Sequence, residues 1–203
     1  MPPNVFAPDK RVYPGRPGSP RLVRRPSMSE NATRLARLYK GFAQQFPDVK
    51  PITARQLDQE LQGPKGAELI MIDVRTVEEQ QVSRLPGRVL SRDDFESIIY
   101  QTAKSTPLVT YCTAGLRSGK YAEELMKEGY TDVRNLEGSI LQWTQEGFPL
   151  VTGDQESTKD VHVFSRSWAL QGEGYTPHYF DRGRGVLAIL RSKVSSWLGG
   201  SSA

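Results

Sequence analysis

The first apolar pattern of the chain predicts a helix over residues 27–47. Its apolar positions recur at steps of three and four residues and form one stripe: Leu35, Leu38, Phe42 and Phe46. Ser27 and Glu30 have the spacing of a capping box, which marks a helix start, and Pro47 marks its end. A single stripe of this kind predicts that one face of the helix packs against the rest of the protein.

From residue 48 onward, short apolar runs alternate with helical patterns. The runs predicted as buried strands are 68–74, 107–112 and 131–136. A capping box of Thr53 and Gln56 precedes a short predicted helix that carries Leu57 and Leu61. Further helical patterns occupy 91–104, 118–128 and 139–147. Strands that alternate with helices predict an α/β fold, with a central parallel sheet flanked by helices.

The N-terminal segment, residues 1–26, is rich in proline and arginine. Its prolines are Pro2, Pro3, Pro8, Pro14, Pro17, Pro20 and Pro26. Such a composition does not bury enough apolar surface to fold alone, so we expect a disordered basic tail. The segment is also Arg-rich and poor in acidic residues, as organelle transit segments are, although it lacks a clear amphipathic helix. Both interpretations stay open.

The pattern changes again after Thr152, and residues 153–203 form a C-terminal extension. The apolar stretch 161–164 predicts an added strand. Residues 184–198 have the pattern of a short basic amphipathic helix. Such a helix either packs on the domain or makes a peripheral contact with a partner or a lipid surface.

Composition and charge exclude several classes of protein. Hydrophobic residues at 37% and charged residues at 25% are typical of a soluble globular protein. No apolar run approaches the ~20 residues of a membrane span, and no secretory signal opens the chain. The formal net charge of +4 comes largely from the N-terminal tail, which argues against a nucleic-acid-binding domain. We therefore expect an intracellular protein, either cytoplasmic or, if the tail is a transit segment, located in a chloroplast or another organelle.

The cysteine and histidine content limits the chemistry further. Cys112 is the only cysteine, which excludes an intramolecular disulfide, a CxxC metal site and an internal resolving thiol. The two histidines, His162 and His178, are separated in sequence and do not suggest a zinc cluster. The sequence predicts no metal site, and a reducing compartment suits a single free thiol.

Cys112 lies where a predicted strand gives way to a predicted helix. The first N–H groups of a helix have no internal partner and carry a partial positive charge, which favours a thiolate. Ala114 and Gly115 are small enough for the loop to curl with its amides inward, and such a nest binds anions. Arg117 adds a fixed cation. The pattern predicts a site for an anionic, electrophilic substrate, whereas an isolated cysteine after an apolar strand is often an inert buried residue.

Three segments of the chain resemble one family. The stretch CTAGLRSG (112–119) resembles the active-site loop of the rhodanese sulfurtransferases, in which Cys is followed by two residues, Gly, one residue, Arg and Ser. The segment MIDVRTVEEQQVSRLPGRV (71–89) is similar to the family's Asp-Val-Arg…Glu-Glu…Pro-Gly segment. The segment NLEGSILQWTQEGFPL (135–150) is similar to its closing Leu-x-Gly-Gly…Trp…Gly-x-Pro. The resemblance implies a single rhodanese domain over 48–152, with a rhodanese-like three-layer fold.

The resemblance also implies a reaction. The Cys112 thiolate takes the outer sulfur of a small anionic donor such as thiosulfate, becomes a persulfide, and passes the sulfur to an external thiol or protein acceptor. No cofactor is implied. The loop residues that would bind the substrate are Thr113, Ala114, Gly115, Leu116, Arg117 and Ser118. Asp73 would support the neighbouring strand end, and Arg75 would either attract the anion or form a structural ion pair with Asp73.

Several departures from the family pattern keep alternatives open. Thr113 and Ala114 stand where several thiosulfate-active members carry a cation, and the second glycine of the closing segment is replaced by Ser139. Four residues separate Cys112 from Arg117, whereas related Cys-based phosphatases have five, so the loop suits a single sulfur better than a phosphate. The alternative to a sulfurtransferase is a non-enzymatic rhodanese-like module that carries persulfide sulfur or binds regulatory partners. Residues 158–175 also resemble an extension of some rhodanese-like proteins from photosynthetic organisms.

Overall fold

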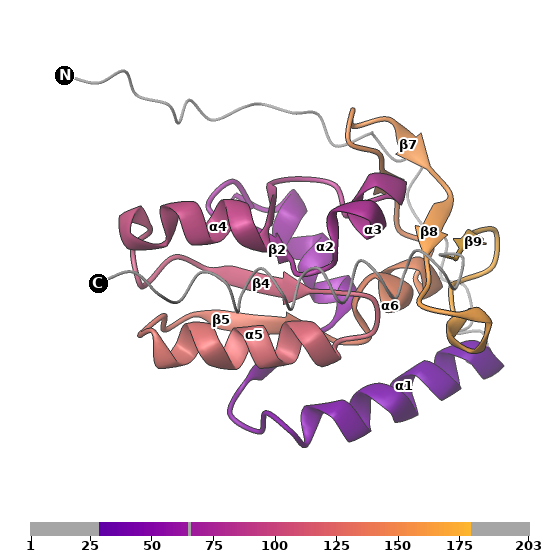
Figure 1. Ribbon diagram of the computed structural model, residues 1–203, viewed down its shortest axis with the longest axis horizontal. Coiled ribbons are helices and arrows are strands. Elements are labelled where there is room, and N and C mark those ends of the chain that lie inside the picture. The colour runs from indigo at the N-terminus through magenta and orange to yellow at the C-terminus, as the bar shows by residue number, and fades with distance from the viewer. Residues whose placement is uncertain (1–28, 65, 180–203) are drawn as a thin grey trace, which may run out of the picture.

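The computed structural model describes residues 29–64 and 66–179 (Figure 1). The predictions for the tail at 1–26 and for the amphipathic helix at 184–198 lie outside these described residues. None of the helices in the described part is long and apolar enough to cross a membrane.

A five-stranded sheet lies at the centre of the fold, in the order β1-β5-β4-β2-β3. All of its pairs are parallel, as predicted. The strands are β1 (Lys50–Ile52), β2 (Ile70–Asp73), β3 (Val89–Ser91), β4 (Leu108–Tyr111) and β5 (Val133–Leu136). The central strands β2 and β4 are buried at every position, which is expected of parallel strands that are covered on both faces.

Two apolar clusters lie on opposite faces of this sheet. The side chains of Met71 and Val109 belong to one cluster, and those of Ile70 and Leu108 belong to the other, because successive strand residues point to opposite faces. The first cluster includes residues of α2 (Ala54–Gln62) and α6 (Ser139–Gln145), and the second includes residues of α4 (Arg92–Ile98) and α5 (Leu116–Lys127). The expected three-layer α/β fold is confirmed.

Helix α1 (Glu30–Ala43) packs against α5 and α6. Its N-cap is Ser29, whose Oγ accepts a hydrogen bond from the backbone N–H of Ala32 at 3.0 Å. The predicted capping box of Ser27 and Glu30 is therefore wrong, because Ser29 satisfies a free N–H of the first turn. The helix ends before Phe46, which is buried in the turn that follows it.

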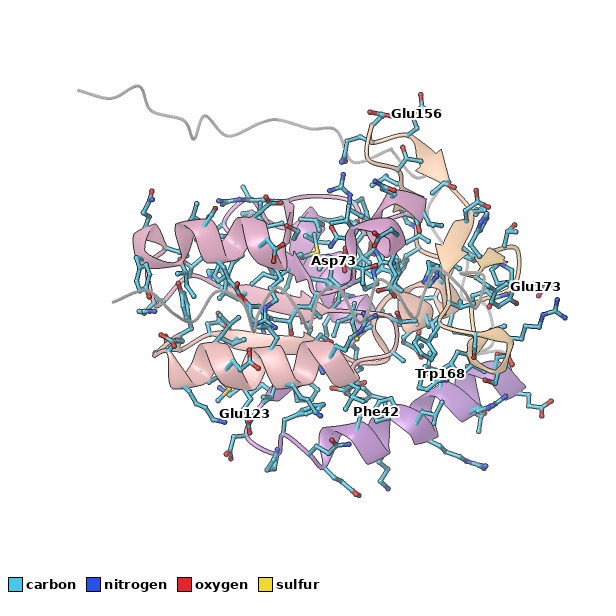
Figure 2. All side chains as sticks on the ribbon, viewed as in Figure 1. Phe42, Asp73, Glu123, Glu156, Trp168 and Glu173 are labelled. Atoms are coloured by element: carbon cyan, nitrogen blue, oxygen red, sulfur yellow. The ribbon has the colours of Figure 1, made fainter. Side chains whose placement is uncertain are left out.

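The extension, together with the strand β6 (Leu150–Val151) that precedes it, forms two small sheets at one end of the molecule, beside α3 (Val77–Val82) (Figure 1). Strands β6 and β7 (Ser157–Thr158) are antiparallel, and β8 (Asp160–His162) and β9 (Thr176–His178) are parallel. The strand predicted over 161–164 is present with shifted bounds. Between β8 and β9 lies η2 (Arg166–Trp168), where Trp168 stacks on Phe42 of α1 with ring centroids 6.1 Å apart (Figure 2).

Several local features of the structure differ from the sequence-based predictions. Strands β1 and β3 were not predicted, because each is only three residues long and too short to show a period. The helix expected over 91–104 is α4 followed by the 3-10 turn η1 (Ile99–Gln101). Helix α5 starts at Leu116 rather than at Ser118, which places Arg117 in its first turn.

Candidate functional site

Cys112 follows β4 directly, at the carboxyl edge of the sheet, and only 2% of the residue is exposed. Its Sγ accepts the backbone N–H of Gly115 at 3.2 Å and the hydroxyl of Ser118 at 3.4 Å. Gly115 is the N-cap of α5 and has a φ of 102°, and a Cβ there would lie 2.6 Å from the ring of Tyr39. The position therefore requires glycine both for its backbone angle and for its space.

The Cys112 thiol has a pKa below its ordinary value. Burial alone would raise this pKa, because it disfavours the charged form. The positive charge of Arg117 and the hydrogen bonds from Ser118 and Gly115 outweigh that effect. The loop is thus built to hold a thiolate, as expected at a helix N-terminus.

Arg117 lies against the carboxylate of Glu79 on α3. The two guanidinium nitrogens Nη1 and Nη2 are 2.8 and 2.9 Å from the two carboxylate oxygens, which is a bidentate pair. Nη2 also donates to Thr113 Oγ1 at 3.1 Å, and Thr113 in turn donates to Glu79 at 3.2 Å. The Arg117 side chain is 43% exposed, whereas that of Glu79 is 4% exposed. The buried Glu79 carboxylate therefore fixes the guanidinium, while the Arg117 side chain remains partly exposed to solvent.

The carboxylate of Glu79 lies close to polar groups from four segments of the chain. Besides Arg117 and Thr113, its carboxylate accepts the backbone N–H of Thr76 at 2.9 Å, in the capping box of α3. His162 Nδ1, on β8 of the extension, lies 3.4 Å from Glu79 Oε1. Burial alone would raise the pKa of Glu79, but His162, Arg117 and Arg75 hold it well below its ordinary value. The carboxylate is accordingly ionised in the folded protein.

Ser139 is a site residue that sequence reasoning missed. Its Oγ accepts the backbone N–H of Cys112 at 3.0 Å and lies 3.4 Å from Ser118 Oγ and 3.9 Å from Cys112 Sγ. Its φ is 52°, a left-handed conformation that is uncommon for a residue other than glycine. The only signal was that Ser139 replaces the second glycine of the closing segment. This backbone conformation beside the thiol makes Ser139 a candidate functional residue.

Asp73 and Arg75 form a second carboxylate–guanidinium pair at the same sheet edge, and both side chains are fully buried. Arg75 Nε and Nη2 lie 2.9 and 2.7 Å from the Asp73 oxygens. Nη2 also donates to the Ser83 carbonyl at 2.6 Å, and Nη1 to the Glu79 carbonyl at 3.4 Å. Every polar nitrogen of the guanidinium has a protein partner. This geometry is that of the structural ion pair, one of the two roles expected for Arg75.

The predicted loop residues divide into three groups. Gly115 and Ser118 contact Sγ, and Thr113 and Arg117 are tied to Glu79. The side chains of Ala114 and Leu116 instead pack into the apolar clusters on the two faces of the sheet. Glu79 and His162 were not predicted, although Glu79 has the spacing of a capping-box residue after Thr76.

A cavity of about 620 Å³ lies beside the loop, between α1 and the carboxyl ends of β1 and β5. Tyr39 and Gly138 form part of its wall, and Cys112 is not among its lining residues. Tyr39 packs on Gly115, and burial raises the pKa of the Tyr39 hydroxyl to about 12. The cavity therefore borders the loop without opening onto the thiol. Within 29–64 and 66–179, no group of three or more His, Cys, Asp or Glu residues is placed to hold a metal ion.

Comparison with known proteins gives consistent matches to the central part of the chain. Residues 53–146 match the family described as Rhodanese-like domain. A protein named sulfurtransferase from Allochromatium vinosum is 30% identical over 104 residues, which cover 51% of this chain and 95% of the relative. Thiosulfate sulfurtransferase 18 of Arabidopsis thaliana is 33% identical over 70 residues, which cover 34% of this chain and 52% of that relative.

Other relatives have different names. The tRNA uridine(34) hydroxylase of Corynebacterium efficiens is 28% identical over 106 residues, which cover 48% of this chain and only 33% of that protein. Among solved structures, a rhodanese-like domain protein from Staphylococcus aureus is 30% identical, with a TM-score of 0.43, and the match covers 51% of this chain and 98% of that chain. The matched part thus spans nearly all of the shorter relatives but only about a third to a half of the longer ones.

Proposed function

The chain belongs to the rhodanese family, and from that premise we propose that it moves a sulfane sulfur from a donor such as thiosulfate to an external acceptor through a persulfide on Cys112. Sulfur transfer in general is supported by the relatives that are named sulfurtransferases. The single observation that carries the proposal is a thiol of lowered pKa at the carboxyl end of β4, between donors from Gly115 and Ser118.

In the first half-reaction, the Cys112 thiolate attacks the outer sulfur of thiosulfate. A new S–S bond forms to Sγ, the bond between the two donor sulfurs breaks, and sulfite leaves with the electron pair. The cysteine is left as an anionic persulfide, so charge is conserved. The loop amides and the nearby Arg117 favour negative charge at this position both before and after the transfer.

In the second half-reaction, a nucleophile attacks the outer persulfide sulfur. Cyanide would take the outer sulfur and leave as thiocyanate, and a thiolate would take it and become a new persulfide. In both cases the electrons of the S–S bond return to Cys112, which becomes a thiolate again. Cys112 is the only cysteine in the chain, so no second thiol of the same chain resolves the persulfide. The acceptor is therefore an external small thiol or a protein.

Arg117 is the binding group for the anionic donor in this proposal, with support from Thr113 and the loop amides. Its side chain is partly exposed, and its guanidinium is held in place by Glu79, which suits a group that binds an incoming anion. Arg75 has no exposed nitrogen and supports the strand end together with Asp73.

A thiosulfate–cyanide assay tests the proposal directly. The wild-type protein should release thiocyanate, and Cys112→Ser should release none. Because the loop lacks a cation at Thr113 and Ala114, other sulfane donors belong in the same assay. The absence of thiocyanate with every donor, despite sulfur loading of Cys112, would favour the alternative role of persulfide carrier or regulatory module.

The compartment is part of the proposal as well. The Arg-rich, acid-poor N-terminus supports an organelle such as the chloroplast. N-terminal sequencing of the native protein tests this, because a cleaved transit segment removes the first residues. An intact start at Met1 or Pro2 would contradict it.

A further inference from the structure

His162 connects the C-terminal extension to the catalytic loop. It is the last residue of β8, and its side chain is 2% exposed. Its Nδ1 lies 3.4 Å from Glu79 Oε1, the same oxygen that accepts from Arg117 and Thr113. The residue lies beyond 53–146, the part of the chain that matches the family. The extension therefore places a polar side chain against the network that holds Arg117.

A glutamate carboxylate needs several fixed partners to stay in one orientation. Its terminal torsion has broad minima, so the plane of the two oxygens rotates easily when it is held from one side only. At Glu79, the Thr76 amide fixes Oε2 from α3, and His162 approaches Oε1 from the extension. The bidentate geometry with Arg117 depends on this plane, because both guanidinium nitrogens must meet both oxygens.

We propose that His162 is a positioning residue for sulfur transfer, which acts through Glu79 to hold Arg117 beside Cys112. The C-terminal extension is then part of the active site rather than an appendage to it. The catalytic consequence rests on the proposed function, but the effect on the Cys112 thiol does not. The charged and titratable groups around Glu79 are Arg117 on α5, Arg75 after β2 and His162 on β8. Tyr39 on α1 packs on Gly115 of the loop.

The chain offers matched variants for a test. In His162→Asn, the amide nitrogen can donate to Glu79 in place of Nδ1. The leucine of His162→Leu has nearly the same shape as asparagine but no donor. The control is His178→Leu, because His178 faces His162 in the β8–β9 pair and contacts Asp160 instead of the site. His162→Phe is a second donor-free variant, for use if His162→Leu does not fold.

The first readout is the pKa of the Cys112 thiol, measured by ultraviolet titration of the thiolate with Cys112→Ser as the baseline. His162→Leu should raise this pKa by about half a unit, because a loosened Arg117 stabilises the thiolate less. His162→Asn and His178→Leu should leave it at the wild-type value. A purely structural role for His162 would change the melting temperature and leave the thiol pKa unchanged.

The second readout is donor turnover, for which His162→Leu should lose about tenfold relative to His178→Leu. An unchanged thiol pKa in His162→Leu, or an equal rise in His162→Asn, would overturn the positioning role. If the wild-type protein transfers no sulfur, the proposed function fails, and the thiol titration still decides the role of His162.

Discussion

Two arginine–carboxylate pairs lie at the same edge of the sheet, and they differ in what remains open to solvent. In the Asp73–Arg75 pair both side chains are fully buried, and every polar nitrogen of the guanidinium has a protein partner. In the Glu79–Arg117 pair the Glu79 side chain is buried, whereas the Arg117 side chain is 43% exposed. The first pair is closed to any substrate, and the second presents a cation next to Cys112.

This difference in exposure indicates what each arginine stabilises or binds. A buried pair whose hydrogen bonds are all made within the protein holds the backbone segments it joins, here the end of β2 and the carbonyls of Ser83 and Glu79. A half-exposed guanidinium contributes less to folding, because water screens its charge, but it is free to meet an anion. In our proposal, the same residue type therefore stabilises the fold at Arg75 and binds the anionic donor at Arg117.

The largest expected effect is on folding, from Arg75→Met. This variant keeps most of the side-chain volume and leaves the Asp73 carboxylate buried without its cation. The free energy of unfolding should fall by about 3–5 kcal/mol in a urea titration. A double variant with Asp73→Leu should recover part of the loss, because it removes both charges. A loss of less than about 1 kcal/mol in the single variant would mean that the pair does not hold the fold.

Arg117→Ala should show the opposite balance between folding and activity. We expect the unfolding free energy to fall by only about 1–2 kcal/mol, because solvent screens the Arg117 side chain and the Glu79 carboxylate keeps its donors from Thr76 and Thr113. Donor turnover should fall by about tenfold to a hundredfold, because a cation near the reacting sulfur is lost. Arg92→Ala is the matched control, since Arg92 is similarly exposed and pairs with Glu96 away from the site. Activity and melting temperature that fall in proportion would count against a direct role for Arg117.

Two variants of Ser139 separate an effect on stability from an effect on the rate of persulfide formation. Ser139→Gly relieves the left-handed backbone and loses the hydroxyl, so its unfolding free energy should stay within about 0.5 kcal/mol of the wild type. Ser139→Ala keeps the strain and loses the same hydroxyl, and should cost about 1–2 kcal/mol. Both variants should slow persulfide formation equally, measured in a single turnover. A wild-type rate in Ser139→Gly would show that the hydroxyl does not act on the thiol.

The smallest expected effect is a shift in a pH profile. A thiol with a lowered pKa is fully ionised above that pKa, and the ionised fraction falls about tenfold per unit below it. The rate of persulfide formation should therefore be flat at high pH and drop as the pH falls through an inflection below the ordinary value of about 8.5. In Arg117→Ala the inflection should move upward. An inflection at or above the ordinary value in the wild type would contradict the electrostatic role of the loop.

Much of the sheet and the position of the thiol could be predicted from local patterns. The apolar runs at β2 and β4 predicted these two strands, and the strand ends placed Asp73 and Cys112 at the carboxyl edge of the sheet. The capping box of Thr53 and Gln56 is confirmed as the start of α2. Signals of this kind are readable because both partners lie within a few residues of each other.

The network around Arg117 could not be predicted in this way. Glu79 and Arg117 are 38 residues apart and meet only when α3 and α5 pack at one edge of the sheet. His162 and His178, although separated in sequence, are direct partners in the register of β8 and β9. The left-handed backbone of Ser139 has only one sequence signal, the glycine that the family's closing segment has at this position, because serine itself rarely adopts this conformation. Tertiary contacts determine all three.

The central claim is that Cys112 carries the transferred sulfur. Intact-mass measurement after incubation with thiosulfate or another sulfane donor tests it most directly, because the chain has a single cysteine. We predict a mass increase of one sulfur atom that cyanide removes and that Cys112→Ser does not acquire. No adduct with any donor, or the same adduct in Cys112→Ser, would contradict the account.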